Sequence, residues 1–282
     1  MQASRASDRL LQIYLGVFLV YLFLPLVIMA AATFNTSRFP TVTPWLGTTT
    51  RWFEALYNDA GMWVALENSF IIGFFVILVS VPLGVAAAVV LNGVHARARS
   101  LLYAVMVSPL LTPGVIIGIS TLVFWDRLGV KGGLHLAVIG QSSFITAYVM
   151  LMVLARLQRF DTSLEEAALD LGASHGQVFR RILAPHLKPA ILSGAVLAFF
   201  QSFENYNTTL FTRGTDTTLT IYIASKVRTG LTPAVNALGL ILILVTVVGA
   251  VAYEVMRRRE SARERAALRN AERADMEALQ IA

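Results

Sequence analysis

The sequence FDTSLEEAALDLGASHGQVFRRILAPHLKP, residues 160–189, is a polar stretch between two long apolar runs, and it decides how the chain is organised. A threonine–serine pair at 162–163 can cap a helix whose first turn carries Glu165 and Glu166, which the helix dipole favours. Gly172 is placed to end that helix, because glycine readily takes the positive φ that many helix ends require. The stretch therefore predicts a short helix that ends just before Gly172.

The predicted helix has one apolar face. The side chains that share it recur at the spacing i, i+3, i+4, i+7: Leu164, Ala167, Ala168 and Leu171. A helix this short between two apolar runs has no surface of its own chain to bury against, so we expect a groove on another protein to receive it. A second short helix is predicted over 177–183, ending before Pro185.

Apolar runs fill most of the chain on either side of this stretch. Hydrophobic residues make up 56% of the 282 residues and charged residues only 14%, against about 25% charged in soluble domains. A membrane-spanning helix needs about 20 apolar residues, whereas barrel strands are about 10 residues long and alternate in polarity. Six uniformly apolar stretches meet the helical criterion: 10–32, 68–91, 101–125, 134–155, 190–211 and 234–253. The sequence predicts an all-α fold, a polytopic membrane bundle of six transmembrane helices over 10–256.

Basic residues set the predicted orientation. The N-tail 1–9, the loops 92–100 and 156–189, and the tail 257–282 hold 16 of the 23 Lys and Arg residues. Loops rich in Lys and Arg stay cytoplasmic, so both termini are predicted cytoplasmic. The first span is expected to remain uncleaved, because its apolar run exceeds the 7–15 residues of a signal peptide. The tail mixes Arg and Glu at helical spacing, typical of a solvated helix or of a contact with a cytoplasmic partner.

The sequence lacks the patterns of an enzyme's active site. It has no Cys and no Gly-Lys pair, which excludes thiolate metal sites and a phosphate-binding P-loop. Its four histidines form no His-Glu-x-x-His motif. We therefore expect no catalytic residue, no metal and no cofactor held by this chain. The net charge of +6 is attributed to topology and to anionic lipid rather than to nucleic acid.

The predicted fifth span contains a polar cluster. An acid at the bilayer centre costs about 2.5–3.5 kcal/mol on translocon scales, so Glu204 is expected to face a water-filled path or a partner subunit. Phe203 and Tyr206 beside it can attract an ammonium group through cation–π contacts. The candidate substrate-path residues are Gln201, Phe203, Glu204, Asn205 and Tyr206. The alternative is that Glu204 and Asn205 hydrogen-bond helices together.

The polar stretch resembles the EAA motif of the membrane subunits of ABC importers. The match runs Glu166-Ala167-Ala168, three residues, Gly172, nine residues, Ile182-x-x-Pro185, with Ala184 where the family usually has Leu. Other segments are similar to the second permease of spermidine/putrescine importers: Phe34-Asn35-x-Ser37-Arg38, Trp52-Phe53, Ser108-Pro109, Ile221-Tyr222 and Thr232-Pro233-Ala234-Val235-Asn236-Ala237-Leu238.

The resemblance implies a type I importer-permease fold with a cytoplasmic coupling helix. In that family two permeases form a heterodimer on two ABC ATPases, which use ATP and Mg, and a periplasmic solute-binding protein delivers the solute. The residues that the resemblance assigns to ATPase coupling are Leu164, Glu165, Glu166, Ala167, Ala168, Asp170, Leu171, Gly172, Ala173, Arg180, Arg181, Ile182 and Pro185. Asp126 and Arg127, at the outer interface, are candidate contacts for the binding protein.

The resemblance also implies a transport direction and a class of solute. We expect import of a polyamine or related organic cation across the bacterial inner membrane by alternating access. Polyamine permeases tend to carry two acids where this chain has Glu204 and Asn205, so a quaternary amine, an amino-acid-like molecule or another small solute stays open. A stand-alone secondary transporter is the alternative from another class, but it would leave the polar stretch unexplained.

Overall fold

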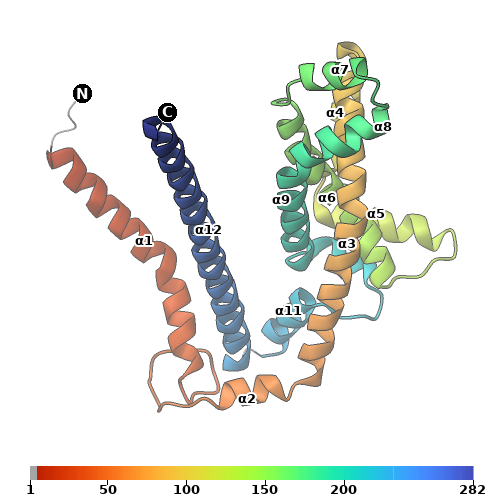
Figure 1. Ribbon diagram of the computed structural model, residues 1–282. Helices are drawn as coiled ribbons and strands as arrows, with labels where there is room; N and C mark the ends of the chain where they lie inside the picture. Colours follow the sequence, from red (N-terminus) through yellow and green to blue (C-terminus); the bar gives the residue numbers. More distant parts are fainter. Residues whose placement is uncertain (1–4, 231, 282) are drawn as a thin grey trace. The chain divides into compact units, whose positions relative to one another are not determined.

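The computed structural model is helical almost throughout the residues that it describes, 5–230 and 232–281, with side chains described over 7, 9–95, 98–230 and 232–259 (Figure 1). The chain forms two compact units. One contains Asp59–Thr229, and the other contains the residues up to Asn58 and from Gly230 onward. The helices, in chain order, are α1 (Arg5–Thr33), α2 (Arg51–Tyr57), α3 (Ala60–Gly93), α4 (Ala96–Leu111), α5 (Gly114–Asp126), α6 (Leu134–Leu157), α7 (Ser163–Asp170), α8 (His175–Val178), the π-helix η1 (Phe179–Leu183), α9 (Ala184–Phe203), α10 (Asn207–Thr212), α11 (Leu219–Thr229) and α12 (Pro233–Ile281).

The first unit is built from α1, α2 and α12. The loop after α1 is organised by Asn35, which is fully buried. Its Oδ1 accepts hydrogen bonds from the backbone N–H groups of Ser37 (3.2 Å) and Leu46 (3.0 Å), and its Nδ2 donates to the Thr41 carbonyl at 2.9 Å. The Trp52 Nε1 donates to the Asn35 carbonyl at 2.8 Å. Asn35 and Trp52, two residues of the resemblance, therefore share one structural role.

The second unit has its core between α3, α6 and α9. Val149 of α6 lies between two glycines of the neighbouring helices. A Cβ at Gly84 would stand 2.7 Å from the Val149 Cβ, and one at Gly194 would stand 3.3 Å from the Val149 Cγ1. Small residues let membrane helices approach this closely. The buried side chains around Val149 include Ile72, Ile145, Met150 and Ala198.

Five helical segments are long and apolar enough to cross a membrane: Arg9–Thr33, Ala60–Gly93, Leu134–Leu157, His175–Phe203 and Pro233–Arg259. The stretch 101–125, expected as one span, is divided into α4 and α5, bent by 99° at the break between them. Thr112 has an extended backbone (φ −87°, ψ 127°), as expected for a residue before proline, and Pro113 has no N–H to continue the helix. Counted as one bent span, the pair brings the described residues to six candidate spans.

The last helix, α12, continues past the predicted membrane span to Ile281. Arg258 donates from Nε to the Glu254 carboxylate at 2.6 Å, an i, i+4 pair on an exposed face. The Arg and Glu side chains predicted to alternate beyond Arg259 lie outside the described side chains.

Candidate functional site

The short helix predicted in the polar stretch is present as α7, Ser163–Asp170, with Glu165 and Glu166 in its first turn. The predicted cap is wrong in detail. Thr162 occupies the N-cap without a side-chain hydrogen bond, and Asp161 takes over because its Oδ1 accepts from the Ser163 N–H at 3.0 Å. Hydrogen bonds from Ser163 lower the pKa of Asp161. The helix therefore begins on an ionised acid, which its dipole favours.

The helix α7 ends at the predicted glycine. Gly172 has φ +84°, and its N–H donates to the Leu169 carbonyl at 2.9 Å while the Ala173 N–H donates to the Ala168 carbonyl at 3.0 Å. This pair of bonds is the Schellman arrangement, which needs a residue in the left-handed region. A Cβ at Gly172 would meet nothing within 4 Å, so backbone conformation alone favours glycine here.

The apolar face of α7 is uncovered by the rest of this chain. No residue of α7 is buried, and Leu164 and the adjoining Leu171 are 53% and 89% exposed. Exposed leucines on an amphipathic helix outside the candidate spans are typical of surfaces that bind another protein.

The second predicted helix is longer than expected. It begins at His175 and continues without a stop through the π-helix η1 into α9, so Pro185 does not end it. Ser174 starts it with a capping box: the Ser174 Oγ accepts from the Gln177 N–H (3.4 Å), and the Gln177 Oε1 accepts from the Ser174 N–H (2.8 Å). The wider π turn precedes Pro185, whose missing N–H interrupts the regular ladder.

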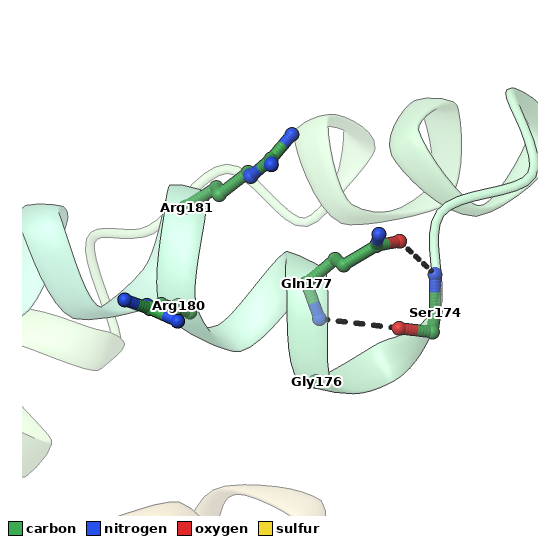
Figure 2. Close-up of a pocket in the computed structure, with 5 residues that line it drawn as sticks. All are labelled: Ser174, Gly176, Gln177, Arg180 and Arg181. Atoms are coloured by element: carbon green, nitrogen blue, oxygen red, sulfur yellow. Dashed lines mark hydrogen bonds between the residues drawn. The ribbon is translucent and has the colours of Figure 1, made fainter.

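A shallow cavity of about 570 Å³ lies beside this helix start. Figure 2 shows the five residues that line it: Ser174, Gly176, Gln177, Arg180 and Arg181. Arg180 and Arg181 are exposed and take part in no described hydrogen bond or ion pair. Ile182, which the resemblance also assigns to coupling, is half-buried, and Pro185 is exposed. The loop thus presents two positive charges beside an exposed apolar helix.

The two ends of the coupling loop are tied together. The Arg156 Nε at the end of α6 donates to the His186 carbonyl of α9 at 3.2 Å. The ring of Phe160 packs edge-on against His186, with centroids 5.1 Å apart. These contacts join the end of α6 to the start of α9, so the two ends of the segment from 158 to 185 lie close together.

The predicted fifth span is broken where the polar cluster lies. The helix α9 ends at Phe203, and Glu204 is its C-cap rather than an interior residue. Asn205 makes the break, because its Oδ1 accepts from the N–H groups of Thr208 and Thr209, both at 3.2 Å, and so caps α10. The alternative given for Asn205, a structural hydrogen-bonding role, describes these contacts.

A buried amide that the sequence reading missed holds this break in place. Gln141 of α6 is 1% exposed. Its Oε1 accepts from the Ser202 Oγ at 2.6 Å, and its Nε2 donates to the Thr209 Oγ1 at 2.7 Å. Thr209 Oγ1 in turn donates to the Asn205 Oδ1 at 3.1 Å. The sequence did contain a signal for this role, because Gln141 is a large polar residue within the apolar span 134–155. Polar side chains buried in such spans rarely lack hydrogen-bond partners.

Phenylalanines gather beside Glu204. The ring of Phe203 lies with its centroid 5.5 Å from those of Phe70 and Phe199. Glu67, one helical turn before Phe70 on α3, also lies in a candidate span but was left outside the predicted one. Glu67 and Glu204 are exposed, and neither carboxylate has a hydrogen-bond or ion-pair partner among the described residues.

The remaining predicted residues lie elsewhere in the second unit. Gln201 is half-buried on α9, and the Tyr206 hydroxyl accepts from an Arg228 Nη at 3.2 Å. Asp126 and Arg127, at the end of α5, are exposed. Phe203 therefore belongs to the phenylalanine cluster and Glu204 follows it in the chain, whereas the Tyr206 hydroxyl bonds to Arg228.

An unpredicted carboxylate, Asp59, joins the start of α3 to α11. Its Oδ2 accepts from the Tyr222 hydroxyl at 2.7 Å and from Lys226 Nζ at 2.9 Å, and its Oδ1 accepts from the Met62 N–H at 3.2 Å. Burial, the largest single influence, opposes ionisation, but the three hydrogen bonds together outweigh it and lower the pKa of Asp59. Burial and the Asp59 carboxylate raise the pKa of Tyr222. Asp59 is thus an ionised anchor for α11.

The chain is similar to permeases over nearly its whole length. It is 36% identical over 270 residues to the putrescine transport system permease protein PotI of Escherichia coli (strain K12), covering 93% of this chain and 95% of that protein. It is 31% identical over 239 residues to the spermidine/putrescine transport system permease protein PotC of the same strain, covering 84% and 90%.

The fold has a solved counterpart. A chain of a bacterial ABC transporter involved in the import of alginate superposes with a TM-score of 0.68 at 16% identity, covering 92% of this chain and 98% of that one. The pattern of the family described as binding-protein-dependent transport system inner membrane component matches residues 80–262. This chain belongs to that family and is a multi-pass permease subunit of a binding-protein-dependent ABC importer, not an enzyme.

Proposed function

We propose that this permease imports a small organic cation of the polyamine class, with two amines, by alternating access. The observation that carries the proposal is a pair of exposed carboxylates without described partners next in the chain to a ring cluster: Glu67 lies one helical turn before Phe70, and Glu204 follows Phe203 directly, while the rings of Phe70, Phe199 and Phe203 pack together. Carboxylates attract ammonium groups, and aromatic faces add cation–π attraction. Glu67 supplies the second acid that is missing at Asn205. The printed names of the permeases PotI and PotC support the same solute class.

We infer that the chain works in a complex. A second permease completes the bundle, two ABC ATPases use ATP and Mg in the cytoplasm, and a periplasmic binding protein supplies the solute. The exposed face of α7, with Leu164 and Leu171, supports docking in an ATPase groove. Movement of the ATPases would be transmitted through α7 and the hydrogen bond between Arg156 and His186 to the membrane helices. The Lys and Arg bias supports a cytoplasmic location of both termini.

Uptake of radiolabelled putrescine and spermidine into vesicles that contain the assembled complex tests the solute class. Glu67→Gln and Glu204→Gln should each lower the uptake rate at low substrate concentration about fivefold, because a partly hydrated ion pair contributes up to about 1 kcal/mol. Glu54→Gln is the matched control, since Glu54 is an exposed acid on α2. Full uptake of both amines by the double variant would contradict the cation path.

The same vesicles distinguish the alternative solutes. If a quaternary amine or an amino acid competes so strongly that the wild type no longer takes up putrescine, the path would be assigned to that solute instead.

Failure of any ATPase to co-purify with the permease would contradict the proposed assembly. A phosphatase fused after Ala282 should be inactive if the C-terminus is cytoplasmic.

A further inference from the structure

A second concave site lies between α10 and α11. It is a cavity of about 200 Å³. Its lining includes the apolar side chains of Leu210 and Ile221 and two arginines, Arg213 from the end of α10 and Arg228 from α11. The α11 residues that line it, Ile221, Ala224, Ser225 and Arg228, recur at i, i+3, i+4, i+7 and so share one face.

The arginines of this cavity have hydrogen-bonding capacity to spare. Arg228 is exposed, and its described bond is to the Tyr206 hydroxyl at 3.2 Å. Arg213 donates from one Nη to the Asp216 carbonyl, while its Nε is buried without a partner. Neither guanidinium forms an ion pair with a described carboxylate. A cavity with two such groups selects an anion, and their planar geometry favours a carboxylate.

The helix α11 is held so that this face stays available. Its Tyr222 and Lys226, which lie on a different face, bind Asp59 at the start of α3. Ser69 also accepts from the Leu219 N–H at 2.8 Å. Because α11 is anchored through these contacts, Arg228 is presented from a fixed helix and not from a free loop.

The cavity lies toward the end of the second unit opposite the coupling loop. The continuous helix from His175 to Phe203 has 29 residues and is roughly 43 Å long at 1.5 Å per residue. Figure 1 shows α7 and α11 separated along the unit accordingly. The segment 212–233 carries three basic residues and one acid, Asp216. Two of these basic residues, Arg213 and Arg228, line the cavity together with Tyr206, whereas Lys226 is paired with Asp59.

We propose that the Arg213–Arg228 cavity receives an acidic side chain of the periplasmic binding protein when that protein docks. This inference rests on the proposed assembly with a binding protein. The family is defined by dependence on such a protein, and the cavity is on the side from which the protein approaches if the coupling loop is cytoplasmic. A carboxylate seated between the guanidiniums fixes the register of docking and aligns the released solute with the path.

The test uses the whole complex in nanodiscs and measures ATPase rate against the concentration of its binding protein. Arg228→Glu should raise the concentration for half-maximal stimulation about tenfold, as expected for loss of one charge-assisted hydrogen bond, and leave the maximal rate unchanged. Lys131→Glu, at an exposed lysine outside the cavity, should leave both values unchanged. Arg228→Gln provides a neutral variant should the reversed charge prevent assembly.

The outcomes separate the two proposals. A wild-type complex that its binding protein does not stimulate contradicts the proposed function itself. A stimulated wild type with an unchanged half-maximal concentration in both Arg228 variants contradicts only the cavity. An effect of Arg228→Glu that is present in nanodiscs with anionic phospholipid and absent in purely zwitterionic ones assigns the cavity to an anionic lipid headgroup and overturns the proposal. If an Asp→Lys or Glu→Lys change on the binding protein restores the half-maximal concentration of the Arg228→Glu complex, that result supports the proposed contact.

Discussion

The polar bridge formed by Gln141 allows a quantitative test of what holds the α9–α10 break. Gln141 joins Ser202, the last but one residue of α9, to Thr209 in α10 through bonds of 2.6 and 2.7 Å. All three side chains are at most 4% exposed. Replacing Gln141 by Leu keeps a side chain of similar bulk but removes the acceptor for Ser202 and the donor for Thr209.

The size of the effect follows from which groups lose their partners. Thr209 keeps its bond to Asn205 at 3.1 Å, whereas the buried Ser202 hydroxyl is left without its acceptor. A buried polar group without a partner costs about 1–3 kcal/mol, so Gln141→Leu should destabilise by about that amount. Ser202→Ala removes the orphaned group, and the two changes should couple by about 0.6–1.7 kcal/mol, the range for hydrogen bonds between membrane helices.

A double-mutant cycle measures this coupling. The wild type, Gln141→Leu, Ser202→Ala and the double variant are purified in the same detergent, and the free energy of unfolding is obtained from titration with SDS. We expect the double variant to be more stable than the sum of the single losses predicts. Strict additivity would refute the bridge. Thr246→Ala, at an exposed threonine whose hydroxyl donates to the Leu242 carbonyl within α12, serves as a control change that should be additive with Gln141→Leu.

Three further predictions concern other parts of the chain. Gly172→Val should slow ATP-driven uptake, because a β-branched residue at φ +84° costs at least about 1–2 kcal/mol. Gly176→Ala is the control, since Gly176 has no positive φ, and it should not slow uptake. Both variants are measured as solute taken up per ATP hydrolysed. Leu171→Asp should reduce co-purification of the ATPase without lowering the amount of permease in the membrane, measured by blotting. The pKa of Asp59 lies below its ordinary value of 3.8, so its stabilisation is complete above that pH and is lost as the pH falls through the lowered pKa. Asp59→Asn should remove this acid-dependent step from the unfolding temperature measured against pH, and an unchanged profile would contradict the role of the carboxylate.

Local features of the coupling loop could be predicted because short-range interactions decide them. The positive φ of Gly172 and the acidic first turn of α7 depend on residues within one or two helical turns. The cap passed from Thr162 to Asp161 because an Asp side chain two residues before an N–H competes well for it. The helix that begins at His175 ran past Pro185 because a π turn accommodated the proline, and no local pattern announces such a turn.

The polar residues around the α9–α10 break show where local reasoning stopped. Apolar composition suggested one span through Glu204, because hydropathy averages over the few polar residues in a window. Asn205 instead caps a new helix, and the partner that stabilises the break, Gln141, lies about 60 residues earlier in the sequence. Glu67 escaped notice because it adjoins the predicted start of its span, whereas α3 begins at Ala60.

The sequence by itself determined the membrane class, the all-helical fold and the short amphipathic helix of the polar stretch, since hydrophobic length and helix-end residues act locally along the chain. The break between α4 and α5 follows from the local Thr112–Pro113 pair, but only the tertiary structure decided the bend of 99° and the packing of Gly118 of α5 against α10, where a Cβ would stand 2.8 Å from the Thr208 carbonyl oxygen. It also decided which polar residues meet: Gln141 with Ser202, and Asp59 with Lys226. Such pairings depend on helix packing between distant segments, and hydropathy carries no information about them.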